Sequence, residues 1–205
     1  MIKYIDLSHE ITNDTPVYPG DAPARLSQYR YLDTDGYNCF KLETGMHAGT
    51  HIDIPMHLIE STVTIDKMPL DTFAGDGCLL DVRGKSMIGY EDKYLSYVSK
   101  DDVVLLYTGY DNKYGTEEYY SEHPVIEKEL ADFFISRQIK MLGFDMPSPD
   151  RYPYEIHKIL LTNGISIIEN MANLSKLLNV GAFEIVAFPL KIRAEASMVR
   201  AVARI

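Results

Sequence analysis

One short stretch of the sequence, residues 47–57 (HAGTHIDIPMH), constrains the chain more than any other. It holds three of the six histidines and an aspartate. Alternate residues of a β-strand point to opposite faces, so a strand here would carry His, Gly, His, Asp, Pro and His on one face and mostly apolar residues on the other. An α-helix would turn Asp53 away from His47 and His51, and Pro55 cannot occupy a helix interior. The pattern therefore favours an extended segment with one chemical face.

The stretch cannot be one straight strand, however. At roughly 3.3 Å per residue, His47 and His57 would lie about 33 Å apart. Gly49 tolerates positive φ and Pro55 ends regular pairing, so we predict a turn at 47–50 and an extended piece at 51–54. Two imidazoles and a carboxylate gathered in this way suit zinc, or the slightly harder manganese. The alternative, that these are ordinary structural histidines, fits a single histidine better than a patterned cluster.

Composition and charge limit the class of protein. With 205 residues, 46% of them hydrophobic, the chain is predicted to form one globular domain over residues 1–205. Its net charge of −10 argues against nucleic acid and anionic membrane surfaces as partners. The start shows no leader pattern and no apolar run approaches about 18 residues, which predicts a cytoplasmic protein. Cys39 and Cys78 make no disulfide framework and are expected to be small buried residues, although Cys39 could lie near the metal.

Alternation, turn residues and helical spacing predict a mixed α/β fold, with a hairpin early in the chain and helices alternating with buried strands later. The hairpin joins residues 25–32 and 37–44 through a turn at 33–36. The other predicted strands are 2–7, 77–82, 102–108, 139–144, 165–168, 182–188 and 197–205; the predicted helices are 91–98, 124–138, 154–162 and 173–178.

Several loops and side chains outside the central stretch are candidates for function. The proline-rich segment 17–23 would hold Tyr18 rigidly, either over a substrate or in an ordinary surface turn. Loop 110–120 carries four tyrosines, which suits a pocket or a subunit interface. Loop 145–150 follows a predicted strand, where α/β sheets commonly place their sites. Glu169 ends an apolar strand and needs a metal, a salt bridge or a helix N-terminus as its partner.

Three histidines lie outside the stretch. His157 falls on a predicted helix, and its sequence context ties it only weakly to the cluster. His9 and His123 lie in polar contexts and are interpreted as structural or solvent-facing.

Residues 47–57 resemble the signature H-x-G-T-H-x-D-x-P-x-H of the cyclase family, which includes bacterial kynurenine formamidases and isatin hydrolases. Every fixed position of the signature is matched. Agreement extends to residues 6–8, 15–21 and 108–109 and to the spacing of His157 and Glu169, so it covers nearly the whole chain. The resemblance implies a swivelling β/β/α domain and assembly into a homo-oligomer, a dimer or tetramer.

The resemblance also implies a site with two Zn²⁺ ions per subunit, Mn²⁺ being possible. It places one ion at His47, His51 and Asp53 and the other at Asp53, His157 and Glu169, with both carboxylates able to bridge. His57 would be the general acid/base. Tyr18 falls where kynurenine formamidases usually carry a tryptophan against the substrate ring, and this departure leaves the substrate open.

These observations predict a metal-dependent hydrolase of a small amide or N-formyl substrate. The named activity implied is that of an arylformamidase of tryptophan catabolism, which converts N-formylkynurenine to kynurenine and formate. Two metal ions can lower the pKa of a bound water to about 7 and polarise an amide carbonyl, while His57 takes a proton and returns it to the leaving nitrogen. The alternatives are ring opening of a cyclic amide or lactone, as in isatin hydrolases, and a non-catalytic metal- or ligand-binding protein. A spare imidazole beside a full set of ligands weighs against the last.

Overall fold

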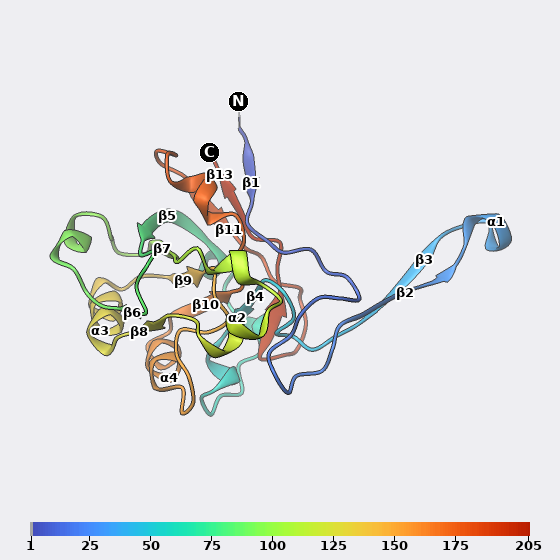
Figure 1. Ribbon diagram of the computed structural model, residues 1–205, viewed down its shortest axis with the longest axis horizontal. Helices are drawn as coiled ribbons and strands as arrows, with labels where there is room; N and C mark the ends of the chain where they lie inside the picture. The colour runs from blue at the N-terminus through green and yellow to red at the C-terminus, as the bar shows by residue number, and fades with distance from the viewer. Residues whose placement is uncertain (1) are drawn as a thin grey trace.

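The computed structural model describes residues 2–205, and its centre is a nine-stranded sheet (Figure 1). The strand order is β1-β13-β11-β5-β7-β9-β10-β4-β12, with β5, β7, β9 and β10 parallel and the remaining pairs antiparallel. Ser8, just after β1, forms a bridge with Met171, just after β10, so the sheet curls. The predicted mixed α/β fold is confirmed. The strands are β1 Tyr4–Asp6, β4 His51–Asp53, β5 Ala74–Asp81, β7 Val103–Tyr107, β9 Met141–Phe144, β10 Ser166–Glu169, β11 Glu184–Val186, β12 Ala196–Met198 and β13 Val202–Arg204.

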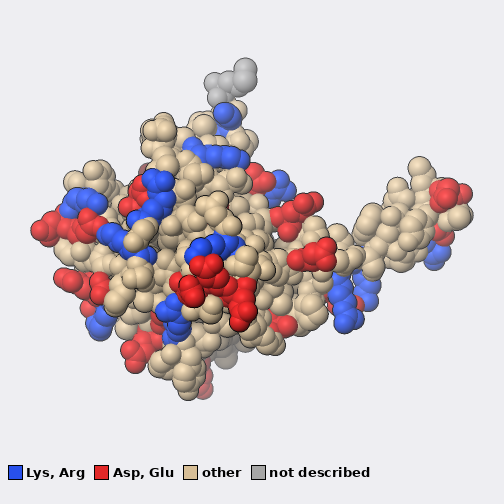
Figure 2. All heavy atoms as spheres, in the orientation of Figure 1, with Lys and Arg blue, Asp and Glu red and all other residues tan. Residues whose placement is uncertain are grey.

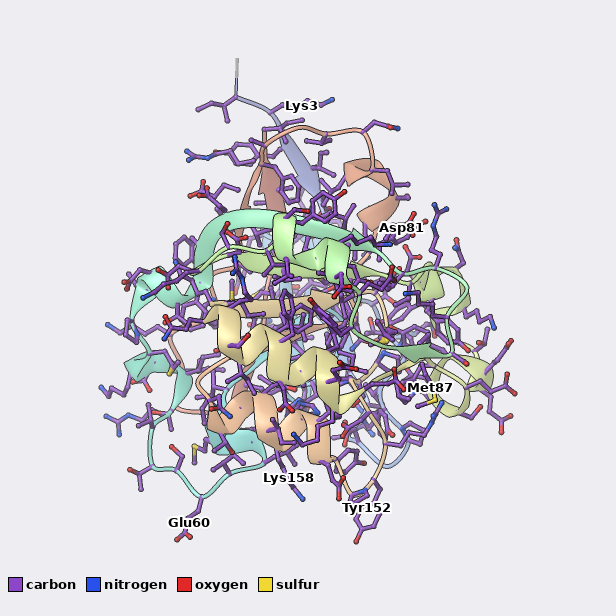
Figure 3. All side chains as sticks on the ribbon, turned by 90° about the vertical axis from the view of Figure 1, so that its left-hand side faces the viewer. Lys3, Glu60, Asp81, Met87, Tyr152 and Lys158 are labelled. Atoms are coloured by element: carbon purple, nitrogen blue, oxygen red, sulfur yellow. The ribbon has the colours of Figure 1, made fainter. Side chains whose placement is uncertain are left out.

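Both faces of the sheet are covered, which explains why β7 is apolar at every position. Alternate residues of β7 join different clusters: Val104 and Leu106 pack on one face of the sheet, Val103 and Leu105 on the other. Helices α3 (Lys128–Arg137) and α4 (Glu155–Thr162) cover the first face and lie side by side (Figure 3). Among the described residues, no helix is long and apolar enough to cross a bilayer.

The predicted hairpin projects from the body of the molecule (Figure 1). Its strands are β2 (Arg25–Arg30) and β3 (Cys39–Glu43), and we call residues 25–43 the arm. The predicted turn at 33–36 is wrong in detail, because the tip forms a short helix, α1 (Leu32–Asp35). Asp35 accepts hydrogen bonds from the backbone N–H of Tyr31 and from the Arg30 guanidinium, which holds this turn in helical form.

The remaining elements are short. Strands β6 (Met87–Ile88) and β8 (Val125–Ile126) form a small parallel pair, and α2 spans Glu117–Ser121. Single 3₁₀ turns span Pro55–His57, Ile65–Lys67, Leu70–Phe73, Asp92–Ser96, Tyr110–Lys113 and Leu174–Leu177.

Three sequence predictions of secondary structure are corrected. The helix predicted at 124–138 begins only at Lys128, because residues 125–127 use their backbone groups against β6 and Pro149. The predicted loop 110–120 contains helix α2, whose first turn is capped by the Thr116 hydroxyl accepting from the Tyr119 N–H. The strand predicted at 197–205 is two strands, since β12 pairs with β4 whereas β13 pairs with β1 and β11.

The two cysteines are half-buried, not fully buried as predicted. Cys39 belongs to the arm, where its thiol lies 2.9 Å from the Tyr29 hydroxyl. The alternative that Cys39 lies near a metal is therefore wrong.

Candidate metal centre

The central stretch bends where its sequence predicts. Gly49 has a φ of +63°, a backbone conformation that favours glycine, and a Cβ at this position would lie 2.6 Å from Ile11 Cδ1, so another residue would strain the backbone and displace the Ile11 side chain. The chain then runs as β4 and turns at Pro55 into a single 3₁₀ turn that ends at His57. The predicted turn and extended piece are both confirmed.

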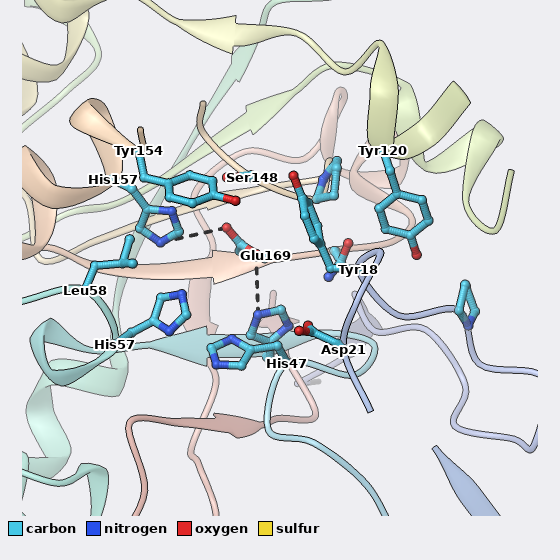
Figure 4. A pocket seen from close by; sticks show the side chains of 14 residues that line it. Tyr18, Asp21, His47, His57, Leu58, Tyr120, Ser148, Tyr154, His157 and Glu169 are labelled. Carbon is cyan, nitrogen blue, oxygen red and sulfur yellow. Dashed lines mark ion pairs between the residues drawn. The ribbon is translucent and has the colours of Figure 1, made fainter. Parts of the chain in front are cut away.

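The sheet brings a second carboxylate to this stretch. In the antiparallel pair of β4 and β10, Glu169 lies directly opposite His51, and Glu169 Oε2 is 3.4 Å from His51 Nε2. Helix α4 packs over β10 and directs His157 to the same place, where its Nε2 is 3.3 Å from Asp53 Oδ2. Figure 4 shows His47, His57, His157 and Glu169 pointing toward one another.

The Asp53 carboxylate lies at the centre of this cluster. Its Oδ1 is 3.0 Å from His47 Nδ1 and 3.5 Å from His51 Nε2. The candidate ligand atoms of His47, Asp53 and His57 all lie within 4.8 Å of one another, and so do those of His51, Asp53 and Glu169. All five residues predicted as metal ligands are therefore brought together.

Most of these polar atoms are buried and, within residues 2–205, have no hydrogen-bond partner. They are Nε2 of His51, Nε2 of His157, both carboxylate oxygens of Asp53 and Oε1 of Glu169. His51 Nδ1 lies 2.8 Å from the Gly49 carbonyl, which can only accept, so Nδ1 carries the proton and the Nε2 lone pair faces the cluster. Buried polar groups without partners are rare, and imidazole and carboxylate atoms are suitable ligands for divalent cations. The side chains therefore fit a metal centre.

The electrostatics of the cluster agree with this fit. Burial alone would lower the pKa of His47, but the carboxylates of Asp53, Glu169 and Glu195 outweigh burial and raise this pKa to about 9. Burial likewise raises the pKa of Asp53, yet the surrounding imidazoles hold it well below its usual range. The carboxylates thus favour positive charge within the cluster. A divalent cation can supply that charge in place of protons.

His57 differs from the other histidines. Burial, together with the neighbouring imidazoles of His47 and His157, lowers its pKa to about 4. Its ring centroid is 4.2 Å from that of His47 and 5.5 Å from that of His157. At neutral pH this imidazole is uncharged and can accept a proton.

A pocket of about 170 Å³ opens onto the cluster. For comparison, a cavity of about 150 Å³ holds one benzene molecule. Tyr18 lines this pocket, and its ring meets that of Tyr120 edge-on at 5.7 Å between centroids. Burial, with a contribution from Tyr154, raises the pKa of the Tyr18 hydroxyl to about 12, so it stays protonated.

Some lining residues were not singled out from the sequence. Tyr120 lies in the tyrosine-rich segment and Ser148 in loop 145–150, so the sequence indicated the segment that contains each residue but not the residue itself. Asp21 also lines the pocket and lies in the proline-rich segment 17–23, which was likewise a candidate. Leu58, Tyr154 and Asn170 line it too, and their sequence contexts carry no such signal.

Glu195 is a further residue that the sequence did not reveal. Its Oε1 lies 3.2 Å from Nε2 of His47, while Nδ1 of the same ring faces Asp53. The contact arises because β12 pairs with β4 and places Glu195 beside Ile54, whose N–H donates to the Glu195 carbonyl.

The remaining histidines do not line the pocket. His123 is buried, and its Nδ1 lies 3.0 Å from the Tyr120 carbonyl, as expected of a structural histidine. His9 stacks on Tyr114 with 3.6 Å between ring centroids.

The curled mixed sheet and the buried histidine–carboxylate cluster define a class of α/β protein whose candidate metal centre lies between two neighbouring strands, β4 and β10, and helix α4. The chain belongs to the cyclase family, since the family model described as "Putative cyclase" matches residues 5–151. The resemblance drawn from residues 47–57 is thus confirmed.

Individual relatives extend over nearly the whole chain. The kynurenine formamidase of Bacillus cereus is 28% identical over 207 residues, covering 98% of this chain and 97% of the relative. Isatin hydrolase A from Labrenzia aggregata, solved with benzyl benzoate, superposes with a TM-score of 0.87 at 22% identity and covers 100% of this chain and 94% of that one. A structure described as a potential metal-dependent hydrolase with cyclase activity superposes with a TM-score of 0.81 at 24% identity. The match covers 100% of this chain and 98% of that one. The fold is shared with both structures.

Proposed function

We propose that the chain is a metal-dependent amidohydrolase that acts as an arylformamidase and converts N-formylkynurenine to kynurenine and formate. The observation that carries the proposal is the set of buried atoms of His51, Asp53, His157 and Glu169 that have no hydrogen-bond partner within residues 2–205, beside a pocket that tyrosines help to line. Similarity to kynurenine formamidases over 98% of the chain supports the choice of substrate.

The proposed metal site takes two divalent cations per subunit, Zn²⁺ or Mn²⁺. His47, His51 and Asp53 would hold one cation, and Asp53, His157 and Glu169 the other. The position of Asp53, with Oδ1 toward two imidazoles and Oδ2 toward the third, supports a bridging role. When bound, such cations lower the pKa of water to about 7 and polarise a carbonyl oxygen.

The protein's own residues supply the proton transfer and the binding of substrate. His57, neutral at pH 7, accepts a proton from the attacking water and returns it to the leaving nitrogen. Tyr18 packs against the aromatic ring of the substrate, with Tyr120 supporting it edge-on. The size of the pocket suits one such ring.

A second candidate is hydrolytic ring opening of a cyclic amide such as isatin. The fold shared with isatin hydrolase A supports it. Tyr18, in place of the tryptophan that the family resemblance leads one to expect, leaves the choice of substrate open.

Turnover of the two substrates distinguishes these candidates. We expect protein loaded with Zn²⁺ or Mn²⁺ to release formate from N-formylkynurenine with a kcat/KM at least tenfold above that for isatin, measured by absorbance of the aromatic products. The reverse ratio would favour ring opening. Metal-loaded protein that is inert toward both substrates and toward a panel of amides and esters would instead be a binding protein.

We also propose the domain organisation, assembly and cellular location of the enzyme. Residues 1–205 act as one domain, and the chain assembles into a homo-oligomer, a dimer or tetramer. A cytoplasmic location and the absence of nucleic-acid and membrane partners stay predictions from the charge and sequence pattern.

Glu195 gives a test of the proposed metal site that does not depend on turnover. We expect Glu195→Gln to lower the affinity for Zn²⁺ by about 10- to 100-fold, because a carboxylate on the outer nitrogen of a ligating histidine orients the ring and raises its basicity. Competition of metal-free protein with a chromogenic chelator measures this affinity. Glu60→Gln, at an exposed position, is the matched control; equal affinities in the two variants would contradict the expected role.

A further inference from the structure

The side chain of Asn170 is tied to the backbone turn that precedes His51. Asn170 directly follows Glu169 at the end of β10, and its side-chain amide donates to the Gly49 carbonyl over 3.1 Å. The same carbonyl lies 2.8 Å from Nδ1 of His51. A carbonyl oxygen has two lone pairs, so it can accept from both groups at once. The Asn170 amide and the His51 ring are therefore linked through one backbone oxygen.

A further hydrogen bond fixes the orientation of the Asn170 amide. The Gly49 carbonyl can only accept, so the amide nitrogen faces it and Oδ1 points the other way. Oδ1 lies 2.8 Å from the Tyr119 hydroxyl, which must donate because Oδ1 also can only accept. Tyr119 is fully buried and Asn170 is 7% exposed, so water has little access to replace either partner.

The backbone of Asn170 is held in an uncommon conformation. Its φ is +54°, in the left-handed region that asparagine enters more readily than most residues. In this conformation its N–H donates to the Met146 carbonyl over 3.1 Å, and its carbonyl accepts from the Thr50 hydroxyl over 2.6 Å. Residues in such conformations cluster at functional sites. Every polar group of Asn170 thus has a partner, and two of these partners, Gly49 and Thr50, lie in the turn before β4.

Tyr119 reaches Asn170 from helix α2, on the outside of the molecule. Figure 2 shows acidic side chains gathered over α2, where Glu117 and Glu118 are exposed. Tyr119 points inward from the same helix, and its ring meets that of Tyr120 edge-on with 5.2 Å between centroids. A phenylalanine ring would fill the same space. The hydroxyl is therefore the part of Tyr119 that packing does not explain.

We propose that Tyr119 and Asn170 are positioning residues for His51. The Tyr119 hydroxyl orients the Asn170 amide, and this amide holds the Gly49 carbonyl in place. The carbonyl in turn keeps a proton on Nδ1 of His51 and directs Nε2 toward Asp53 and Glu169. A hydrogen bond on the outer nitrogen of a ligating histidine fixes both the tautomer and the orientation of the ring. The inference deepens the proposed metal site and rests on it for its functional meaning.

Hydrogen exchange of the His51 Nδ1–H group tests this series of contacts in metal-free protein. Tyr119→Phe keeps the ring and removes only the hydroxyl. We expect it to raise the exchange rate of this proton by at least about tenfold, because the Asn170 amide is no longer held against the Gly49 carbonyl. NMR of protein labelled with ¹⁵N-histidine measures the rate, with the proton assigned by its nuclear Overhauser contacts to Gly49. The backbone amide protons of β7 should keep their wild-type rates.

Tyr94→Phe is the matched control. Tyr94 is also buried, and its hydroxyl also donates a hydrogen bond, to Oε1 of Glu91 over 3.0 Å. It does not line the pocket. We expect this variant to keep the wild-type exchange rate of the His51 proton and the wild-type affinity for Zn²⁺.

The affinity for Zn²⁺ shows whether Tyr119 acts through Asn170. We expect Tyr119→Phe to lower this affinity by about 10-fold and Asn170→Ala to lower it by about 100-fold, as measured by competition with a chromogenic chelator. The double variant should match Asn170→Ala alone, because the hydroxyl then has no amide to orient. Losses that multiply in the double variant would show that Tyr119 acts independently of Asn170 and would overturn the proposal.

The exchange measurement separates this inference from the proposed function. An unchanged His51 exchange rate in Tyr119→Phe overturns the positioning role, whatever metal the protein binds. An increase shared equally by the amide protons of β7 also overturns it, because the hydroxyl then only stabilises the whole fold. Wild-type protein that binds no Zn²⁺ overturns the proposed metal centre, and the exchange rates alone then decide whether Tyr119 positions His51. They also decide the question if circular dichroism shows that Asn170→Ala is unfolded.

Discussion

Asp53→Asn is expected to leave the protein largely without bound metal and to reduce hydrolysis of N-formylkynurenine by at least about 10³-fold. The physical reason is the position of the carboxylate: it is fully buried, both of its oxygens lack hydrogen-bond partners within the described chain, and three imidazoles face it. An amide in its place removes the negative charge and presents an N–H₂ group toward a cation. The substitution is therefore expected to weaken the binding of both proposed cations.

Metal content by mass spectrometry and turnover of the same preparation measure this effect. Asp14→Asn, at an exposed position, is the control and should retain both. An Asp53→Asn protein that binds two equivalents of Zn²⁺ with wild-type affinity would contradict the bridging role.

His57→Ala is expected to keep its metal and to lose about 10²- to 10⁴-fold in kcat, the usual contribution of general acid–base catalysis. The imidazole is neutral at pH 7, because burial and its histidine neighbours lower its pKa to about 4, so one ring nitrogen keeps a free lone pair that can accept a proton. With the side chain removed, no other group with this chemistry is placed at the same point. The KM should change little, since the aromatic wall around Tyr18 is untouched.

Metal content again decides between two roles, because the ligand atoms of His57 lie close to those of His47 and Asp53. If His57→Ala is purified without metal and cannot be reloaded, His57 is a ligand and not the acid/base. Met56→Ala, in the same 3₁₀ turn with its side chain 37% exposed, is the control and should retain both metal and kcat.

The cluster in residues 47–57 could be predicted because its signals are local. Alternation placed His51 and Asp53 on one face, and Gly49 marked the bend that positive φ makes possible there. The apolar run before Glu169 likewise predicted a strand that ends in a buried carboxylate. In each case neighbouring residues carried enough information to predict the local geometry.

The parts that could not be predicted depend on contacts between distant segments. The partnership of Glu195 with His47 requires β12 to pair with β4, and strand order is not encoded in either segment alone. The start of α3 was misplaced for a similar reason: helical spacing extends back to residue 124, but residues 125–127 form backbone hydrogen bonds with other segments instead. Backbone hydrogen bonds to distant segments therefore outweigh the helical spacing of the sequence at residues 125–127.

The strand order also has a consequence for how the protein is made. The histidine-bearing strand β4 lies between β10 and β12, so residues 166–169 and 196–198 flank a segment that is synthesised more than a hundred residues earlier. A nascent chain still lacking these two segments displays His47, His51 and Asp53 without the neighbours that enclose them. The site proposed for the metal is therefore complete only when residues up to 198, nearly the whole chain, are present.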